Sequence, residues 1–314
     1  MTRFVLGTAA FGLAYGTAIP RALPAEADVL AMLDRSGRLG FAGVDTARAY
    51  GSSEERIGRH LALGSGFAPG QVMTKLSPLP NVVNDATPSA AGEAARASLD
   101  ESRRALGIDR LERVLLHRAA HLDIANGAIW HALLREQDAG RIGTVGVSVQ
   151  TPAELERCLA DDRVQAVQLP CNVLDRRFDN PETEARLLAA RVHREVRSVF
   201  LQGVLTADNA AAFPETGAPY DSEGVAAWLR RGADVFAGGA LDAFCASYVA
   251  GLAWVDGMVF GVDNMQQIER LAVLRAAPPM DRETRQRVRA ARPDVPDALL
   301  DPSKWKARNR IDAA

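Results

Sequence analysis

Residues 45–54, which read Asp-Thr-Ala-Arg-Ala-Tyr-Gly-Ser-Ser-Glu, place the carboxylate of Asp45 and the phenol of Tyr50 just after a short apolar stretch. Lys75 and His117 each end a further apolar stretch. A phenol with its ordinary pKa near ~10 delivers protons poorly at neutral pH, and a nearby ammonium favours its ionised form. Lys75 could supply that ammonium, Asp45 could hold it charged, and neutral His117 could donate a hydrogen bond to a carbonyl oxygen. The four residue types therefore indicate carbonyl reduction with Tyr50 as the proton donor.

Eight short apolar runs alternate with segments of helical periodicity, and Asp45, Lys75 and His117 end the second, third and fourth runs. This alternation predicts a parallel sheet with right-handed crossovers, and eight units favour its closure into an α/β fold, the (β/α)8 barrel. A doubly wound sheet is the alternative. In a barrel the carboxyl ends of all strands share one mouth, so the three side chains should converge there. The expected strands are residues 4–8, 41–46, 71–75, 113–117, 144–148, 166–169, 196–199 and 257–262.

Local signals predict where several helices begin. The segments 52–55 and 151–154 both match the capping-box pattern, and residues 87–107 read as a helix between Thr-Pro and a terminal Gly. The long gap between residues 199 and 257 predicts an inserted loop plus helices. We expect residues 1–314 to form one domain, with a proline-rich tail from about 277 to 314 packing over the barrel.

Composition excludes several classes of function. The 314 residues include 37 basic and 39 acidic side chains, so a net charge of −2 argues against a nucleic-acid partner. The three cysteines, Cys158, Cys171 and Cys245, have no CxxC spacing, and the histidines other than His117 lack a second ligand at metal spacing. We therefore expect no disulfide framework and no metal site. Without a charged leader or a run of eighteen apolar residues, we expect a soluble cytoplasmic protein with no membrane partner.

The catalytic candidates together resemble the aldo-keto reductase family, whose pattern of Asp-Thr-Ala-x-x-Tyr-Gly is followed by a strand-end lysine and a strand-end histidine. The likeness extends from residues 6–12 to residues 260–263, and segments 169–177, 198–203 and 301–305 are similar to a divergent bacterial branch of the family found near sugar and polysaccharide genes. The resemblance implies a (β/α)8 barrel that binds NADP(H) or NAD(H) without a Rossmann motif. It also implies hydride transfer between the nicotinamide and an aldehyde, ketone or sugar.

The resemblance further implies a set of cofactor contacts along the mouth of the barrel. Thr8 and Asp45 map near the nicotinamide ribose, and Ser148 and Gln168 map to the carboxamide. Two departures leave the choice between NAD and NADP open. Asp263 replaces a basic residue that often faces the 2′-phosphate, while Arg270, one helical turn on, could still reach that phosphate. The remaining implied contacts are Ser198 and Phe200 along the pyrophosphate and Gly261, Asp263, Asn264 and Gln267 at the adenosine end; Arg197 occupies the usual position of the aromatic residue that stacks on nicotinamide.

Four further residues are candidates for the substrate pocket: Tyr15, Arg118, Asn172 and Trp305. Arg118, beside His117, indicates a polar or anionic substrate. The expected partner is a small carbonyl or sugar substrate, and the chain is expected to be a monomer or a small homo-oligomer. Two other functions stay open: a non-redox epimerase or lyase on the same barrel, and a binding protein that senses the cofactor.

Overall fold

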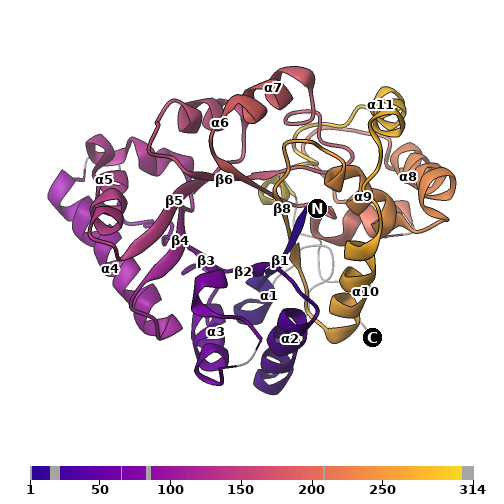
Figure 1. The fold of residues 1–314 in the computed structure, drawn as a ribbon. Coiled ribbons are helices and arrows are strands. Elements are labelled where there is room, and N and C mark those ends of the chain that lie inside the picture. The colour runs from indigo at the N-terminus through magenta and orange to yellow at the C-terminus, as the bar shows by residue number, and fades with distance from the viewer. Residues whose placement is uncertain (1, 15–21, 65, 83–85, 208, 306–314) are drawn as a thin grey trace.

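Eight parallel strands close into a barrel in the computed structural model, which describes residues 2–14, 22–64, 66–82, 86–207 and 209–305 (Figure 1). Each strand pairs with its neighbours in chain order, and β1 closes the barrel by pairing Gly7 with both Asp45 of β2 and Gly261 of β8. The predicted (β/α)8 barrel is confirmed, and the doubly wound alternative is wrong. The strands are β1 (Arg3–Gly7), β2 (Gly43–Asp45), β3 (Val72–Lys75), β4 (Leu111–Leu116), β5 (Ile142–Ser148), β6 (Ala166–Pro170), β7 (His193–Arg197) and β8 (Gly257–Gly261).

Helices surround the barrel, as Figure 1 shows. The longest gap between strands, from β7 to β8, holds two of them, α8 and α9, as the sequence predicts. The α-helices are α1 (Ala9–Gly12), α2 (Glu26–Arg38), α3 (Ser53–Ala62), α4 (Pro88–Leu106), α5 (Ile124–Asp138), α6 (Pro152–Leu159), α7 (Pro181–Ala189), α8 (Ser222–Ala237), α9 (Leu241–Ala250), α10 (Met265–Ala276) and α11 (Arg282–Ala290). The 3-10 turns are η1 (Pro69–Gln71), η2 (Ala119–Leu122), η3 (Leu201–Thr206), η4 (Ala210–Ala212) and η5 (Pro302–Lys304).

Strand β7 begins three residues before the predicted run of 196–199. Its alternate residues His193, Glu195 and Arg197 are ionisable, so the apolar pattern that reveals a buried strand is missing. Arg113 of β4 donates to Glu195 at 2.7 Å. Because β4 and β7 are not neighbours in the sheet, this bond crosses the interior of the barrel. Because the residues of β7 that face the interior are polar, the apolar pattern does not predict where this strand begins.

The barrel interior is layered. Met73, Leu115 and Ala166 form a small apolar cluster separate from the main core, which fills the space between strands and helices. Two residues further along β3 and β6 stand Lys75 and Gln168, whose side chains both bond Asp45. Since side chains alternate across a strand, the polar layer lies directly above the apolar one, at the carboxyl ends of the strands.

The helix-start signals behave differently at the two expected capping boxes. At α6 the box is confirmed: the Thr151 hydroxyl accepts from the Glu154 amide at 3.2 Å, and the Glu154 carboxylate accepts from the Thr151 amide. The predicted box at α3 is wrong, because Ser52 makes no capping bond and Glu55 pairs with Arg48 at 2.7 Å. The Glu55 side chain, which the sequence pattern predicts to cap α3, instead pairs with Arg48 of the preceding loop.

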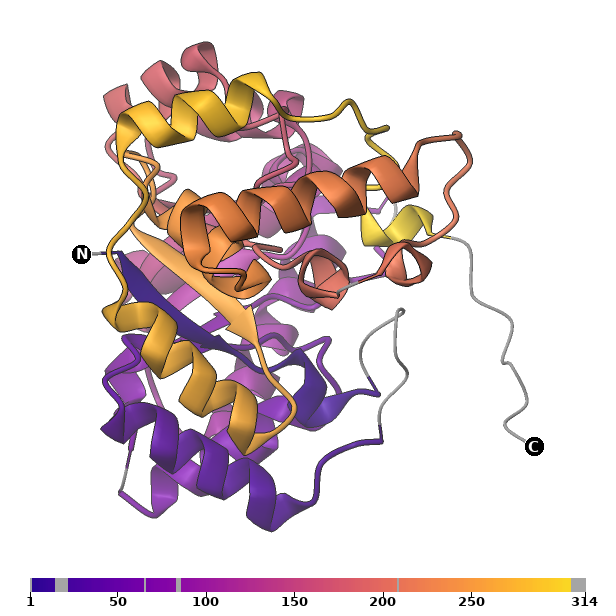
Figure 2. The ribbon, with the colours of Figure 1, turned by 90° about the vertical axis from the view of Figure 1, so that its right-hand side faces the viewer.

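The segment after α10 runs along the outside of the barrel to the mouth, where η5 lies (Figure 2). Arg292, just beyond α11, is buried and forms an ion pair with Asp179, which lies between β6 and α7. The same arginine donates to the hydroxyl of Tyr248 in α9. These contacts attach the described part of the tail to the loop between β6 and α7 and to helix α9. None of the helices in the described residues is long and apolar enough to cross a membrane.

Candidate active site

The four catalytic candidates converge on one cleft at the carboxyl ends of the strands. Asp45 ends β2, Lys75 ends β3, His117 follows β4, and Tyr50 stands in the loop between β2 and α3. All four line a cleft of about 2120 Å³. The ends of parallel strands thus bring the four side chains to one place, as we expect from the sequence.

Asp45 and Lys75 form a buried ion pair at the floor of the cleft. The Nζ of Lys75 lies 2.5 Å from Oδ1 and 2.7 Å from Oδ2 of Asp45, and the two residues are 1% and 3% exposed. Nζ also donates to the backbone oxygen of Thr46 at 3.2 Å, and Gln168 donates to Asp45 at 2.6 Å. Burial has the largest influence on the pKa of Lys75 and lowers it, but the Asp45 carboxylate, Tyr50 and Glu195 together leave that pKa raised. Lys75 is thus a permanent cation at neutral pH.

Tyr50 and His117 line the cleft close to this pair and to each other. The Nζ of Lys75 is 5.3 Å from the centre of the Tyr50 ring, and the ring centres of Tyr50 and His117 are 6.0 Å apart with the rings edge to face. Burial lowers the pKa of His117 to about 3, with further contributions from Lys75 and Arg197. The imidazole is therefore neutral near pH 7, the form in which one ring nitrogen donates a hydrogen bond.

Two glycines hold the Tyr50 loop against the end of α1. Gly51 has a φ of +54°, and a Cβ there would lie 2.1 Å from the carbonyl oxygen of Gly12. Conversely, a Cβ on Gly12 would lie 1.8 Å from the carbonyl oxygen of Tyr50. Only glycine permits this close approach of two backbones, so both positions help to set where the phenol stands.

Sequence analysis missed the ion pair that fixes the same loop from the other side. Arg48 donates to the buried carboxylate of Glu54 at 2.7 Å, and the Thr74 hydroxyl donates to the other oxygen of Glu54 at 2.5 Å. Thr74 precedes Lys75 on β3, so the pair ties the Tyr50 loop to the strand that carries the lysine. Arg48 and Glu54 both lie within residues 45–54, the segment that suggested chemistry, but only their partners reveal a positioning role.

The residues expected near the nicotinamide also line the cleft. Ser148 and Gln168 are neighbours in the register of β5 and β6, and both line the cleft. The Nε2 of Gln168 donates to Asp45, so its Oε1 can accept a hydrogen bond from a ligand. A hydroxyl beside an amide oxygen matches the acceptor and donor of a carboxamide, so the donor set fits this part of a nicotinamide cofactor. Thr8 has a different task here: its hydroxyl donates to the Asp45 carbonyl at 2.9 Å and joins the ends of β1 and β2.

The loop after β7 forms another part of the cleft wall and has an unusual backbone. Ser198, Leu201 and Gln202 have φ values of 63°, 45° and 54°, which are uncommon for residues other than glycine. Ser198 and Phe200 both line the cleft, and Phe200 packs on Phe260 with ring centres 5.0 Å apart. Such backbone strain is typical of functional loops and persists only where the surroundings hold it in place.

The turn between β8 and α10 completes the wall. Gly261, Asp263, Asn264 and Gln267 all line the cleft, and a Cβ on Gly261 would meet nothing within 4 Å. The Asn264 side chain caps α10 by accepting from the Gln267 amide at 3.0 Å, while Gln267 accepts from the Asp263 amide at 2.9 Å. Asn264 and Gln267 therefore shape the turn. Arg270 also lines the cleft and is paired with Asp242 of α9.

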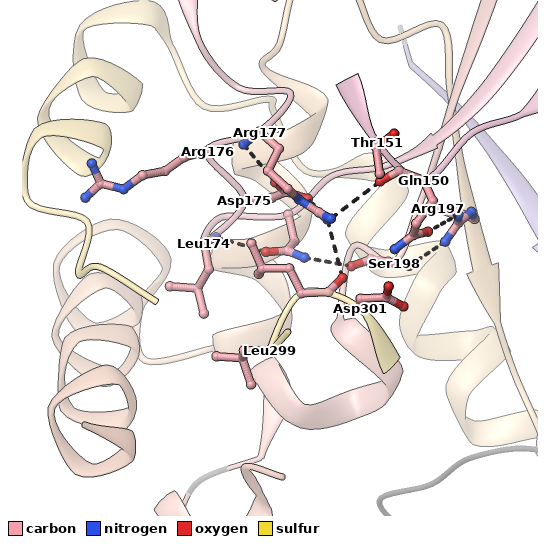
Figure 3. A network of polar contacts seen from close by, with 12 residues as sticks. Gln150, Thr151, Leu174, Asp175, Arg176, Arg177, Arg197, Ser198, Leu299 and Asp301 are labelled. Carbon is pink, nitrogen blue, oxygen red and sulfur yellow. Dashed lines mark hydrogen bonds and ion pairs between the residues drawn. The ribbon is translucent and has the colours of Figure 1, made fainter. Parts of the chain in front are cut away.

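Two arginines stand beside the His117 ring. Arg197, where the family resemblance implies a stacking aromatic residue, donates to Oε1 of Gln150 at 2.6 Å and to the carbonyl oxygen of Val149 at 3.1 Å. Figure 3 shows it beside Gln150 and Ser198. Arg118 is exposed at the cleft and makes no ion pair within the described part of the chain. Both guanidiniums act to lower the pKa of His117, so this side of the cleft is electropositive.

Two of the other three substrate candidates, Asn172 and Trp305, do not line the cleft. Asn172 is fully buried; its side chain donates to the carbonyl oxygen of Ser198 at 3.3 Å and accepts from the Leu174 amide at 3.0 Å. It supports the strained loop rather than facing the cleft. Trp305 donates to the carbonyl oxygen of Leu299 at 3.0 Å and is not among the residues that line the cleft. Tyr15 lies outside the described residues.

No group of three or more His, Cys, Asp or Glu side chains in the described residues is arranged to hold a metal ion. Cys158, Cys171 and Cys245 are free thiols buried at separate places in the core. Burial raises the pKa of Cys158 to about 12, so this thiol is not ionised at neutral pH.

An eight-stranded barrel with a tyrosine, a lysine, an aspartate and a histidine at its mouth defines a class of barrel oxidoreductases. The model of the aldo/keto reductase family matches residues 3–292, and the chain belongs to that family. No curated protein matches the sequence.

Two solved structures illustrate the likeness in fold. An aldo-keto reductase from Bacillus halodurans, in its holo form, superposes with a TM-score of 0.74 at 19% identity, covering 95% of this chain and 95% of that one. A glycerol dehydrogenase from Gluconobacter oxydans superposes with a TM-score of 0.68 at 19% identity, covering 96% of this chain and 94% of that one. At such identities the likeness shows the shared fold alone.

Proposed function

We propose that this chain is an NAD(P)-dependent alcohol or sugar dehydrogenase that transfers hydride between a nicotinamide and an aldehyde, a ketone or a sugar. The observation that carries the proposal is the buried Asp45–Lys75 pair, with its Nζ 5.3 Å from the centre of the Tyr50 ring. When bound, the nicotinamide supplies or accepts the hydride. The protein's task is then to orient the reactants and to move one proton.

Tyr50 is the residue that moves the proton. In reduction the phenol gives its proton to the substrate oxygen, and in oxidation the phenolate takes the proton from the substrate hydroxyl. The Lys75 ammonium stabilises the phenolate that remains after proton transfer, and Asp45 keeps that ammonium charged and in place. Neutral His117 donates a hydrogen bond to the substrate oxygen, which orients the carbonyl and offsets its growing negative charge.

Residues from β5 to α10 would hold the cofactor along the cleft. Ser148 and Gln168 would bind the carboxamide, the Ser198–Phe200 loop would contact the pyrophosphate, and the turn from Gly261 to Gln267 would receive the adenosine end. What supports this path is that all of these residues line one continuous cleft whose other wall carries the catalytic group. The electropositive side formed by Arg118 and Arg197 favours a polar or anionic carbonyl substrate.

A direct test is calorimetric titration of the purified protein with NADH, NADPH and their oxidised forms, followed by assays with panels of aldehydes, ketones and aldoses. We expect at least one dinucleotide to bind and to be consumed in the presence of a carbonyl or hydroxyl substrate. Failure of all four to bind would contradict the oxidoreductase proposal. Binding without turnover on any substrate would instead favour the non-redox or sensing roles.

A further inference from the structure

The cleft wall beyond the catalytic group carries its own set of charges. Helices α8, α9 and α10, with the turn before α10, contribute three carboxylates and two guanidiniums to the lining. This part of the wall therefore carries a net charge of −1. In the proposed function this wall would face the adenosine ribose of a bound dinucleotide, so its charges would affect whether a 2′-phosphate is accepted. The five side chains are Arg230, Asp234, Asp242, Asp263 and Arg270.

Arg270 is the guanidinium best placed, by sequence, to meet a 2′-phosphate, and the structure shows that Asp242 already binds it. Nε of Arg270 lies 2.7 Å from Oδ2 of Asp242, and Nη2 lies 2.7 Å from Oδ1. This is the two-pronged geometry with which arginine also binds phosphate. One edge of the guanidinium is thus occupied by a carboxylate of the protein itself.

The Asp242 side chain is fixed in this position. Its Oδ1 also accepts from the Ala243 amide at 2.8 Å, in the first turn of α9. The bond from Arg270 holds the pKa of Asp242 below its usual range, so the carboxylate is ionised at neutral pH. A 2′-phosphate would have to displace or approach an oriented negative charge, and Asp263 adds a second carboxylate on the same wall.

We propose that the Asp242–Arg270 pair makes this cleft selective for NAD(H) over NADP(H). The inference rests on the proposed function, because it requires a dinucleotide in the cleft. A ribose with two hydroxyls fits an acidic wall, since carboxylates accept hydrogen bonds from hydroxyl groups. The phosphorylated ribose meets repulsion from the carboxylates and a guanidinium that is already engaged.

The test compares the dissociation constants of NADH and NADPH, measured by titration, in the wild type and in Asp242→Asn. The wild type should bind NADH at least tenfold more tightly, and the variant should bind NADPH about tenfold better than the wild type, the gain from one charge-assisted contact. NADH affinity should change by less than threefold. The gain should disappear in Asp242→Asn/Arg270→Gln and should weaken as salt is added.

A matched control is Glu269→Gln, which removes the same charge from the neighbouring position of α10. The Glu269 carboxylate pairs with Arg35 of α2 at 2.6 Å and does not line the cleft, so NADPH affinity should stay at the wild-type value. Equal or tighter binding of NADPH by the wild type would overturn the inference. So would a loss of NADPH affinity in Arg270→Gln alone, because it would show that Arg270 already serves the phosphate. If neither dinucleotide binds, the proposed function itself fails.

Discussion

The Lys75 ammonium lies within 2.7 Å of both carboxylate oxygens of Asp45, and both side chains are withdrawn from solvent. The same nitrogen lies 5.3 Å from the centre of the Tyr50 ring. A buried lysine would ordinarily lose its proton, so the carboxylate is what keeps a positive charge beside the phenol. The stability of the fold and proton transfer by Tyr50 thus both depend on the Asp45–Lys75 pair, and substitutions in this pair can separate the two effects.

Removing the phenol should abolish proton transfer and leave the cleft intact. In Tyr50→Phe we expect kcat to fall by roughly 10²–10⁴-fold, the usual contribution of a general acid or base. Dinucleotide affinity should change little, because the hydroxyl serves the substrate. Steady-state assays and titration of the same preparation check both parts. Full turnover by the variant would remove Tyr50 from its assigned role.

Breaking the buried ion pair should cost stability as well as activity. Lys75→Met leaves the Asp45 carboxylate buried without its cation, and we expect the free energy of unfolding to fall by about 3–5 kcal/mol. Adding Asp45→Asn should recover much of that loss, because the uncompensated charge is then gone, but activity should stay low. Urea unfolding and kcat measured on both single variants and the double variant test this. Additive losses of stability would show that the pair is not coupled.

The close approach of Gly51 to Gly12 should make Gly51→Ala costly. A methyl group there meets the Gly12 carbonyl and a positive φ, so we expect a loss of more than about 2 kcal/mol and a fall in kcat as the Tyr50 loop moves. Gly107→Ala is the matched control: its φ of 66° is similar, but nothing lies within 4 Å of the added Cβ. It should cost only about 1–2 kcal/mol and leave kcat unchanged. Equal effects of the two substitutions on stability and kcat would argue against a positioning role for the glycine pair.

The depressed pKa of His117 makes a prediction about pH. Because the folded-state pKa is about 3 and the unfolded value is near 6.5, the unfolded chain binds the proton first as the pH falls. The contribution of His117 to stability is therefore complete above pH 6.5 and is lost as the pH falls toward 3, with a slope of up to about 1.4 kcal/mol per pH unit.

The measurement is the free energy of unfolding between pH 7 and 4.5 in the wild type and in His117→Gln. The variant should lose less stability over this range, because glutamine does not titrate. His131→Gln, at an exposed position of α5, should follow the wild-type curve. Parallel curves for all three proteins would show that His117 is not shielded from protonation.

The electropositive side of the cleft should discriminate among substrates by charge. For Arg118→Ala we expect kcat/KM to fall about tenfold for carbonyl substrates that carry a carboxylate, and to stay within twofold for neutral ones. Arg110→Ala removes the same charge at the opposite end of β4 and serves as the control. If the two classes of substrate respond alike to Arg118→Ala, the charge of this arginine does not select the substrate.

Much of the fold and of the catalytic group could be predicted because the signals are local. Apolar runs at regular intervals predict parallel strands, and parallel strands bring their carboxyl ends to one face, so Asp45, Lys75 and His117 could be placed together without coordinates. The α4 limits were equally predictable, since Thr87 caps the helix start and Gly107, with a φ of 66°, ends it. Strand β7 was misplaced because its inward residues are ionisable and disrupt the apolar pattern.

By itself, then, the sequence determined the barrel and the meeting of its catalytic side chains, because both follow from periodicity and from the direction of the strands. Only the tertiary structure decided which partners the polar side chains take. It paired Arg48 with Glu54, buried Asn172 beneath the loop after β7, and joined Arg270 to Asp242. The Asn172 and Arg270 contacts join segments 26 and 28 residues apart, and the Arg48–Glu54 pair joins residues six apart, so each depends on how the chain packs to within a few ångströms. No local pattern carries that information, because a hydrogen bond requires a distance that only packing sets.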